Sequence, residues 1–121
     1  MNYEFAPSKL EIKYTDTKYL KKHYGVHIAE GMIKFLAAIE YSLNMHDFAS
    51  MYPYFYLEHL KGNMVNYYSI TLDKKKSKWR LIIQLLNEFD EVVIPNDKEI
   101  TFLKSIKKVR IKELSEHYVE Y

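Results

Sequence analysis

Acid–base and cationic side chains gather beside turns in the second half of this sequence. One stretch reads Glu58-His59-Leu60-Lys61-Gly62-Asn63, the end of an expected strand followed by a polar turn. Lys61 precedes Gly62, where the backbone can approach a phosphate closely. Arg80 stands near the start of an otherwise apolar strand, and a guanidinium binds phosphate in a bidentate manner. These residue types can contact phosphates and transfer protons.

Each of these residues also has a purely structural interpretation. Lys61 is suited to a solvated turn. An Arg among apolar strand residues must find a partner or reach solvent, and Glu58 or Glu116 would be a suitable carboxylate for Arg80.

The order of the motifs resembles the HigB branch of the RelE/ParE toxin superfamily. In that branch a segment of the type H-P-L-K-G-x-x-K-G-x-x-S-I leads into a strand of the type W/Y-R-L-I-F, and the chain closes with I-V-D-Y-H. The matching segments here are Glu58-His59-Leu60-Lys61-Gly62, Tyr67-Tyr68-Ser69-Ile70, Trp79-Arg80-Leu81-Ile82-Ile83 and Glu116-His117-Tyr118. The resemblance covers the last half of the chain by motif and the first half by pattern.

The resemblance implies a type II toxin that cuts mRNA on the ribosome, with a helix-turn-helix antitoxin as its protein partner. Scission by the 2′-hydroxyl needs a base, an acid and cations that stabilise the phosphorane, and it needs no metal or other cofactor. The implied catalytic set is Lys61, Arg80, Glu116, His117, Tyr118, Glu58 and His59. The implied RNA-binding set is Lys74, Lys75, Lys76, Lys78, Tyr67 and Tyr68.

Several positions depart from the family pattern. The family's first histidine falls on Glu58, and His59 falls on its proline, so either of the two can be the acid–base group. In the last strand the histidine and tyrosine are exchanged, yet we expect Glu116 and His117 to matter more than Glu58 and His59. Met64-Val65 replaces the family's basic pair, and the basic run at 74–78 is a candidate replacement.

Two alternatives therefore stay open beside the nuclease. One is a catalytically inactive toxin fold that acts only by binding. The other is a gyrase-directed toxin of the ParE kind.

Bulk composition limits the remaining classes. The 121 residues predict a single domain over 1–121, large enough for a real core. The chain has no Cys, and its net charge is +2, so composition alone does not indicate a nucleic-acid binder. The twelve Tyr fit either a rim of the core or base stacking. No signal peptide or membrane span is visible, which predicts a cytoplasmic protein without membrane contact.

Periodicity predicts an α+β fold, with an N-terminal strand and a helical hairpin packed on one face of a mostly antiparallel sheet of four to five strands. The expected helices cover 17–24 and 26–44, with helical turns over 98–105. The expected strands cover 9–14, 54–60, 66–72, 78–86 and 106–118, with an irregular link at 46–53 and a β-bulge near Lys112-Glu113.

Overall fold

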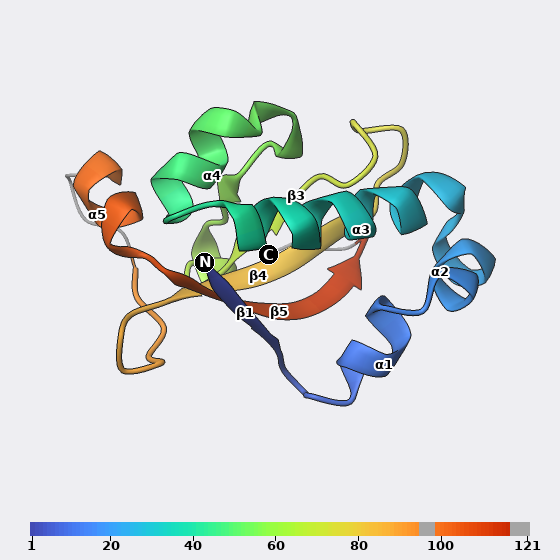
Figure 1. The fold of residues 1–121 in the computed structure, drawn as a ribbon, viewed down its shortest axis with the longest axis horizontal. Coiled ribbons are helices and arrows are strands. Elements are labelled where there is room, and N and C mark those ends of the chain that lie inside the picture. Colours follow the sequence, from blue (N-terminus) through green and yellow to red (C-terminus); the bar gives the residue numbers. More distant parts are fainter. Residues whose placement is uncertain (95–98, 117–121) are drawn as a thin grey trace.

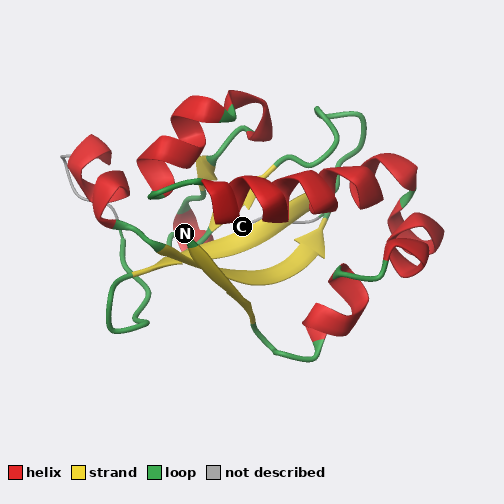
Figure 2. Ribbon diagram, viewed as in Figure 1, coloured by secondary structure: helices red, strands yellow, loops and turns green. Residues whose placement is uncertain are grey.

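A central sheet organises the computed structural model, which describes residues 1–94 and 99–116. Within those ranges the sheet has five strands in the order β1-β5-β4-β3-β2 (Figure 2). Their bounds are Asn2–Phe5 for β1, Glu58–His59 for β2, Tyr68–Ile70 for β3, Arg80–Leu86 for β4 and Lys108–Ser115 for β5. β1 pairs with β5 in parallel, and all the other pairs are antiparallel.

Helices cover one face of this sheet. Figure 1 shows α3 running along that face with α4 beside it, while α1 and α2 lie at the end toward which β5 runs. The helices are α1 (Leu10–Tyr14), α2 (Thr17–Tyr24), α3 (Val26–Tyr41), α4 (Met45–Met51) and α5 (Glu99–Ser105), and the short 3-10 turns are η1 (Pro53–Phe55) and η2 (Gly62–Met64). This arrangement confirms the predicted α+β class.

The core lies between α3 and the sheet. Ile28, Met32 and Ile39 recur along one side of α3 and are at most 1% exposed, as expected for an amphipathic helix. Leu81 and Ile83 alternate along β4 and are completely buried against the same cluster. The predicted shared face of Leu81, Ile83 and Leu85 is therefore confirmed.

Side-chain caps set the starts of two helices. Asp16 accepts hydrogen bonds from the backbone N–H groups of Lys18 and Tyr19 at 3.0 and 3.2 Å, so α2 begins at Thr17 as predicted. Asn44 accepts from the N–H of Asp47 at 2.8 Å and starts α4. Such caps satisfy backbone donors that have no partner inside the helix.

Three predictions of secondary structure are wrong. Residues 9–14 form a turn and α1 instead of a strand, because Leu10 and Tyr14 face inward one helical turn apart while Ile12 is 77% exposed. The link at 46–53 is mostly α4. Residues 54–60 contribute η1 and the two-residue β2, since Tyr56 adopts a left-handed backbone (φ +46°) that ends any extended run.

The other elements occur where they were predicted, with shorter bounds. The helix predicted over 26–44 ends at Tyr41, and α5 lies within the predicted 98–105. The predicted bulge is confirmed: Ile82 pairs with Glu113 and Ile83 with Ile111, so Lys112 is the additional residue of β5. No helix in the described part of the chain is long and apolar enough to cross a membrane.

Candidate functional site

The sheet face turned away from α3 carries the polar side chains of β4 and β5. Arg80 is paired with Ser115, and Ile82 is paired with Glu113. Because successive strand residues point to opposite faces, these residues lie on the side opposite to the buried Leu81. The strand alternation that builds the core therefore also displays Arg80 and Glu113 together.

Glu58 belongs to the same face. It pairs with Ser69, which in turn pairs with Ile82, two residues along β4 from Arg80. Glu58 and Arg80 are two strands apart across the sheet and two residues apart along the strand direction. This geometry places their Cα atoms about 12 Å apart. The register therefore places Glu58 and Arg80 on one face of the sheet, with β3 between their strands.

Arg80 is anchored at the first position of β4. Its Nη1 donates hydrogen bonds to the carbonyl oxygens of Ser77 and Trp79, both at 2.8 Å, and the residue is half-buried. These contacts hold the guanidinium at the strand start. A fixed cation costs little reorganisation when charge develops nearby.

His59 lies on the opposite face from Glu58 and Arg80. Its ring stacks on Tyr68 with a centroid distance of 4.8 Å, and its Nε2 lies 2.7 Å from the carbonyl oxygen of Val65. These contacts tie the imidazole to the turn that follows β2. Of the two acid–base candidates in this segment, Glu58 is the one on the face of Arg80.

The proposed stacking role of Tyr68 conflicts with its burial. The residue is 2% exposed and belongs to the core cluster, so its ring offers no surface to a base. Burial raises the pKa of its phenol to about 12, with a further contribution from the charge of Glu99. Tyr67 is half-buried on the other face and remains the aromatic candidate.

A cavity of about 410 Å³ opens on the polar face around Ile82. Tyr67 and Met64 line it from the turn before β3, and Lys112 and Glu113 line it from the bulge in β5. The remaining lining residues are Ala6, Pro7, Leu10, Tyr14 and Ser115. The cavity thus combines a cation, a carboxylate and two phenols in one place.

Sequence reasoning missed Tyr14, Lys112 and Glu113 as lining residues. The hydroxyl oxygen of Tyr14 accepts a hydrogen bond from the N–H of Leu114 at 3.0 Å. Burial raises the pKa of Tyr14, and the hydrogen bond from Leu114 partly opposes that effect, so the phenol is neutral at physiological pH. The predicted bulge was the signal for Lys112 and Glu113, because bulges occur next to functional sites and re-aim side chains.

The remaining catalytic candidates that the structure describes lie just beyond the ends of strands. Lys61 is exposed immediately before η2, and Gly62 has a φ of +62°, which favours glycine. Glu116 is exposed just after β5. His117 and Tyr118 lie outside the described residues. Where the family has a basic pair, Met64 instead gives the cavity an apolar wall.

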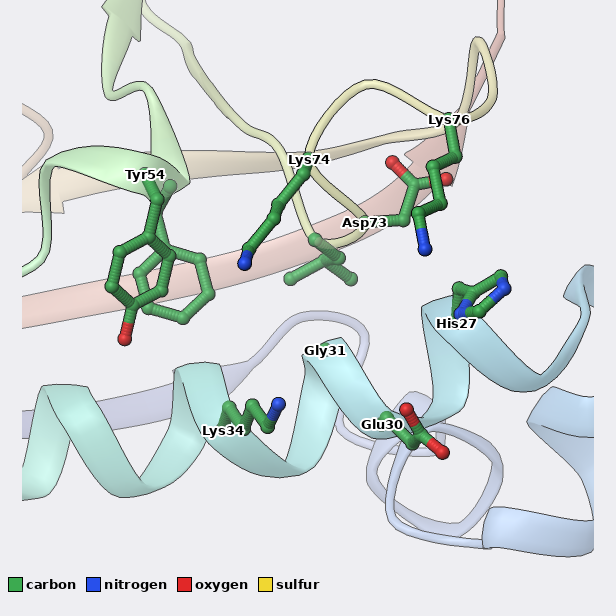
Figure 3. A pocket seen from close by; sticks show the side chains of 10 residues that line it. His27, Glu30, Gly31, Lys34, Tyr54, Asp73, Lys74 and Lys76 are labelled. Carbon is green, nitrogen blue, oxygen red and sulfur yellow. The ribbon is translucent and has the colours of Figure 1, made fainter.

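The basic run lies at the other end of β3 from Met64. Lys74, Lys75, Lys76 and Lys78 are all exposed. The Lys75 Nζ is 4.3 Å from the centroid of the Tyr56 ring, and the Lys74 Nζ is 6.0 Å from that of Tyr54. Figure 3 shows that this turn lies beside α3. The lysines of the turn therefore do not replace the basic pair that the family has at the positions of Met64 and Val65.

Among residues 1–94 and 99–116, no three His, Cys, Asp or Glu side chains are grouped so that they could hold a metal ion. No protein-family model, curated protein or solved structure matches the chain. The functional assignment therefore depends on the residues and their geometry.

Proposed function

We propose that the chain is a toxin of the HigB kind, a metal-independent endoribonuclease that cuts mRNA on the ribosome. The main supporting observation is that Arg80 and Glu58 share the sheet face that carries the 410 Å³ cavity. Helices cover the opposite face. The cation and carboxylate that line the cavity itself are Lys112 and Glu113, beside apolar residues such as Met64 and Ile82. A concave surface with a cation and a carboxylate suits a phosphodiester substrate.

The reaction requires only groups that this chain supplies. The 2′-oxygen attacks the adjacent phosphorus, the bond from phosphorus to the 5′-oxygen breaks, and a 2′,3′-cyclic phosphate and a 5′-hydroxyl result. Glu58 or Glu116 takes the 2′ proton, and Arg80 and Lys61 stabilise the charge on the phosphorane. His117 or Tyr118 returns a proton to the leaving oxygen. Each positioned acid or base contributes about 10²–10⁴-fold in rate.

The cavity differs from the family pattern in its cations. Met64 stands where the first residue of the basic pair is expected, while Lys112 lines the same cavity from the bulge. Each lysine contact to a phosphate adds to both affinity and salt dependence. We therefore expect weaker and less salt-dependent binding of RNA to this face than the resemblance alone implies.

The partners follow from the same proposal. The chain would act on the ribosome and mRNA in the cytoplasm and would be neutralised by a helix-turn-helix antitoxin. A second candidate is a toxin fold that only binds. It is favoured by the apolar Met64 wall and by His59, which faces away from Arg80.

Purified protein added to translating ribosomes tests the proposal. Primer extension should reveal new mRNA 5′ ends that depend on the protein and on a translated message. The matched control is Lys22→Ala on α2, which removes an exposed cation that does not line the 410 Å³ cavity. Inhibition of translation without new ends would select the binding-only function.

A further inference from the structure

A second cavity, of about 430 Å³, lies between α3 and the turn that joins β3 to β4 (Figure 3). It is on the side of the sheet that the helices cover, separate from the polar face of Arg80. Its chemistry-bearing residues are His27, Glu30, Lys34, Tyr54, Asp73, Lys74 and Lys76.

Close backbone packing builds this cavity. Gly31 lets α3 approach the turn so closely that a Cβ at this position would lie 2.0 Å from the carbonyl oxygen of Leu72. The helix face that carries Glu30 and Lys34 is thereby held against the turn. Figure 3 shows the ammonium groups of Lys34 and Lys74 both directed into the space between the two elements.

The turn itself holds lysines in an unfavourable backbone conformation. Lys74 and Lys75 have φ angles of +55° and +66°, and the N–H of Lys76 donates to the carbonyl oxygen of Asp73 at 3.2 Å. Two successive positive φ angles characterise a turn that favours Asn-Gly. Lysines at these positions cost stability, which is consistent with a functional need for their charge.

Asp73 supplies a buried carboxylate to the same cavity. The residue is 6% exposed, and its Oδ2 accepts a hydrogen bond from the Ser77 hydroxyl at 2.7 Å. Its Oδ1 is buried without a hydrogen-bond partner in the part of the chain that the structure describes. An unpaired buried acceptor is unfavourable, so a ligand with a donor group would be stabilised here.

We propose that this cavity binds one nucleotide of single-stranded RNA whose base carries an amino group. The phosphate lies between Lys34 and Lys74, and the base contacts the ring of Tyr54. The turn lysines move toward the phosphate, which exposes the carboxylate of Asp73, and the amino group of the base donates a hydrogen bond to it. Cations beside aromatic rings are typical of sites for single-stranded nucleic acid. Carboxylates accept from the amino group of cytosine.

An acidic peptide fits the cavity less well. Its carboxylates would meet Lys34 and Lys74, but also the carboxylates of Glu30 and Asp73 on the same walls. A nucleotide carries its anionic phosphate and the neutral amino donor of its base at opposite ends, so the phosphate can meet the lysines while the amino group meets Asp73. The proposal goes beyond the nuclease function, because binding here needs no cleavage.

Amide chemical-shift titrations of the free protein with CMP and with UMP test the proposal. The two nucleotides are similar in size, and they differ at two ring positions: cytosine has an amino group at C4 and an acceptor at N3, whereas uracil has a carbonyl oxygen at C4 and an N–H at N3. The N3–H of uracil lies between two carbonyl oxygens that a carboxylate repels, so the amino group of cytosine is the better donor to Asp73. We expect CMP to bind about tenfold more tightly, the effect of one hydrogen bond to a charged group, with shifts at Lys34, Tyr54 and Lys74. A short oligouridine with one central cytidine, compared with oligouridine, distinguishes an RNA segment from a free mononucleotide.

Three variants make the test specific. Lys34→Ala and the double change Lys74→Asn/Lys75→Gly should each weaken CMP binding about tenfold, while Lys22→Ala should not. The double variant gives the turn its preferred residues, so loss of binding would not reflect loss of fold. Asp73→Asn should remove the preference for CMP over UMP.

Three results would overturn the proposal: equal affinity for CMP and UMP, unchanged binding in both lysine variants, or tighter binding of oligoglutamate than of the oligonucleotide. Ribosomal cleavage of mRNA is measured separately. A failure of nucleotide binding would therefore leave the nuclease result intact, and the converse also holds.

Discussion

The hydroxyl oxygen of Tyr14 lies 3.0 Å from the backbone nitrogen of Leu114 and joins α1 to β5 two residues beyond the bulge at Lys112. The bond is buried, and the two residues are separated by 100 positions in the chain. It fixes the part of β5 that presents Glu113 and Ser115 to the cavity on the polar face. A helix of five residues thus supports the site from the other end of the sequence.

Tyr14→Phe should destabilise the protein by about 1–3 kcal/mol, because the Leu114 N–H would be left buried without its acceptor. Urea unfolding measures the change. Tyr41→Phe is the control, since Tyr41 is 78% exposed and should give no measurable change. Equal stabilities of the Tyr14 variant and the natural protein would mean that the hydrogen bond does not hold the bulge.

Tyr68→Phe should have the opposite effect and stabilise the protein at pH 7 by about 1 kcal/mol. Its hydroxyl is buried, and no described residue forms a hydrogen bond with it, so its removal relieves a desolvation cost. A lower midpoint of urea unfolding for this variant would show that the hydroxyl has a partner.

The same phenol predicts a dependence on alkaline pH. Its pKa rises from about 10 in the unfolded chain to about 12 in the fold, so the folded state holds the proton more tightly. The contribution of this pKa difference to the free energy of unfolding is fully present below pH 10 and is lost as the pH rises through 12. Unfolding free energies measured across that range should fall less steeply for Tyr68→Phe than for the natural protein.

Long amphipathic segments were predictable, and short ones were not. The repeat of Ile28, Met32 and Ile39 identifies α3 without ambiguity, and the apolar run of β4 is equally clear. Leu10, Ile12 and Tyr14 fit both a strand and a single helical turn, and only the packing of Tyr14 against β5 decides between them. β1 has four residues and depends on a parallel partner at the far end of the chain, which no local pattern reveals.

The positions of candidate site residues were predictable where the alternation of side chains along a strand alone determines the sheet face on which a residue lies. Arg80 and the bulge at Lys112-Glu113 follow from the alternation of β4 and β5. Whether Glu58 or His59 shares the face of Arg80 could be decided only from the pairing of β2 with β3. A shift of the register by one residue moves every side chain of a strand to the other face of the sheet. The pocket at Gly31 depends on the approach of α3 to Leu72, a contact between segments that share no sequence pattern.

Arg80→Ala should abolish cleavage and leave the fold nearly intact, because a half-buried guanidinium at a strand start contributes more to charge stabilisation than to the core. Arg80→Lys should recover only part of the activity, since lysine lacks the bidentate geometry. Circular dichroism and the cleavage rate on ribosomes are measured together. Unfolding of the alanine variant would identify Arg80 as a structural residue that binds the carbonyls of Ser77 and Trp79.

Glu58→Gln should lower the cleavage rate more than His59→Phe, because Glu58 shares the face of Arg80 and His59 stacks on Tyr68 from the other side. His117→Ala should also cost about 10²-fold, as expected for a positioned acid or base. Single-turnover cleavage rates on ribosomes rank the three variants by their loss of activity. Small and equal losses at all three positions would mean that none of them transfers a proton.

Mapping mRNA 5′ ends after induced expression is the most direct test of whether the protein cuts mRNA. We expect growth to stop and new 5′ ends to appear within translated messages, and we expect neither on induction of Arg80→Ala. Arrested growth without new mRNA ends would contradict the nuclease function and would favour a toxin that acts by binding or on gyrase.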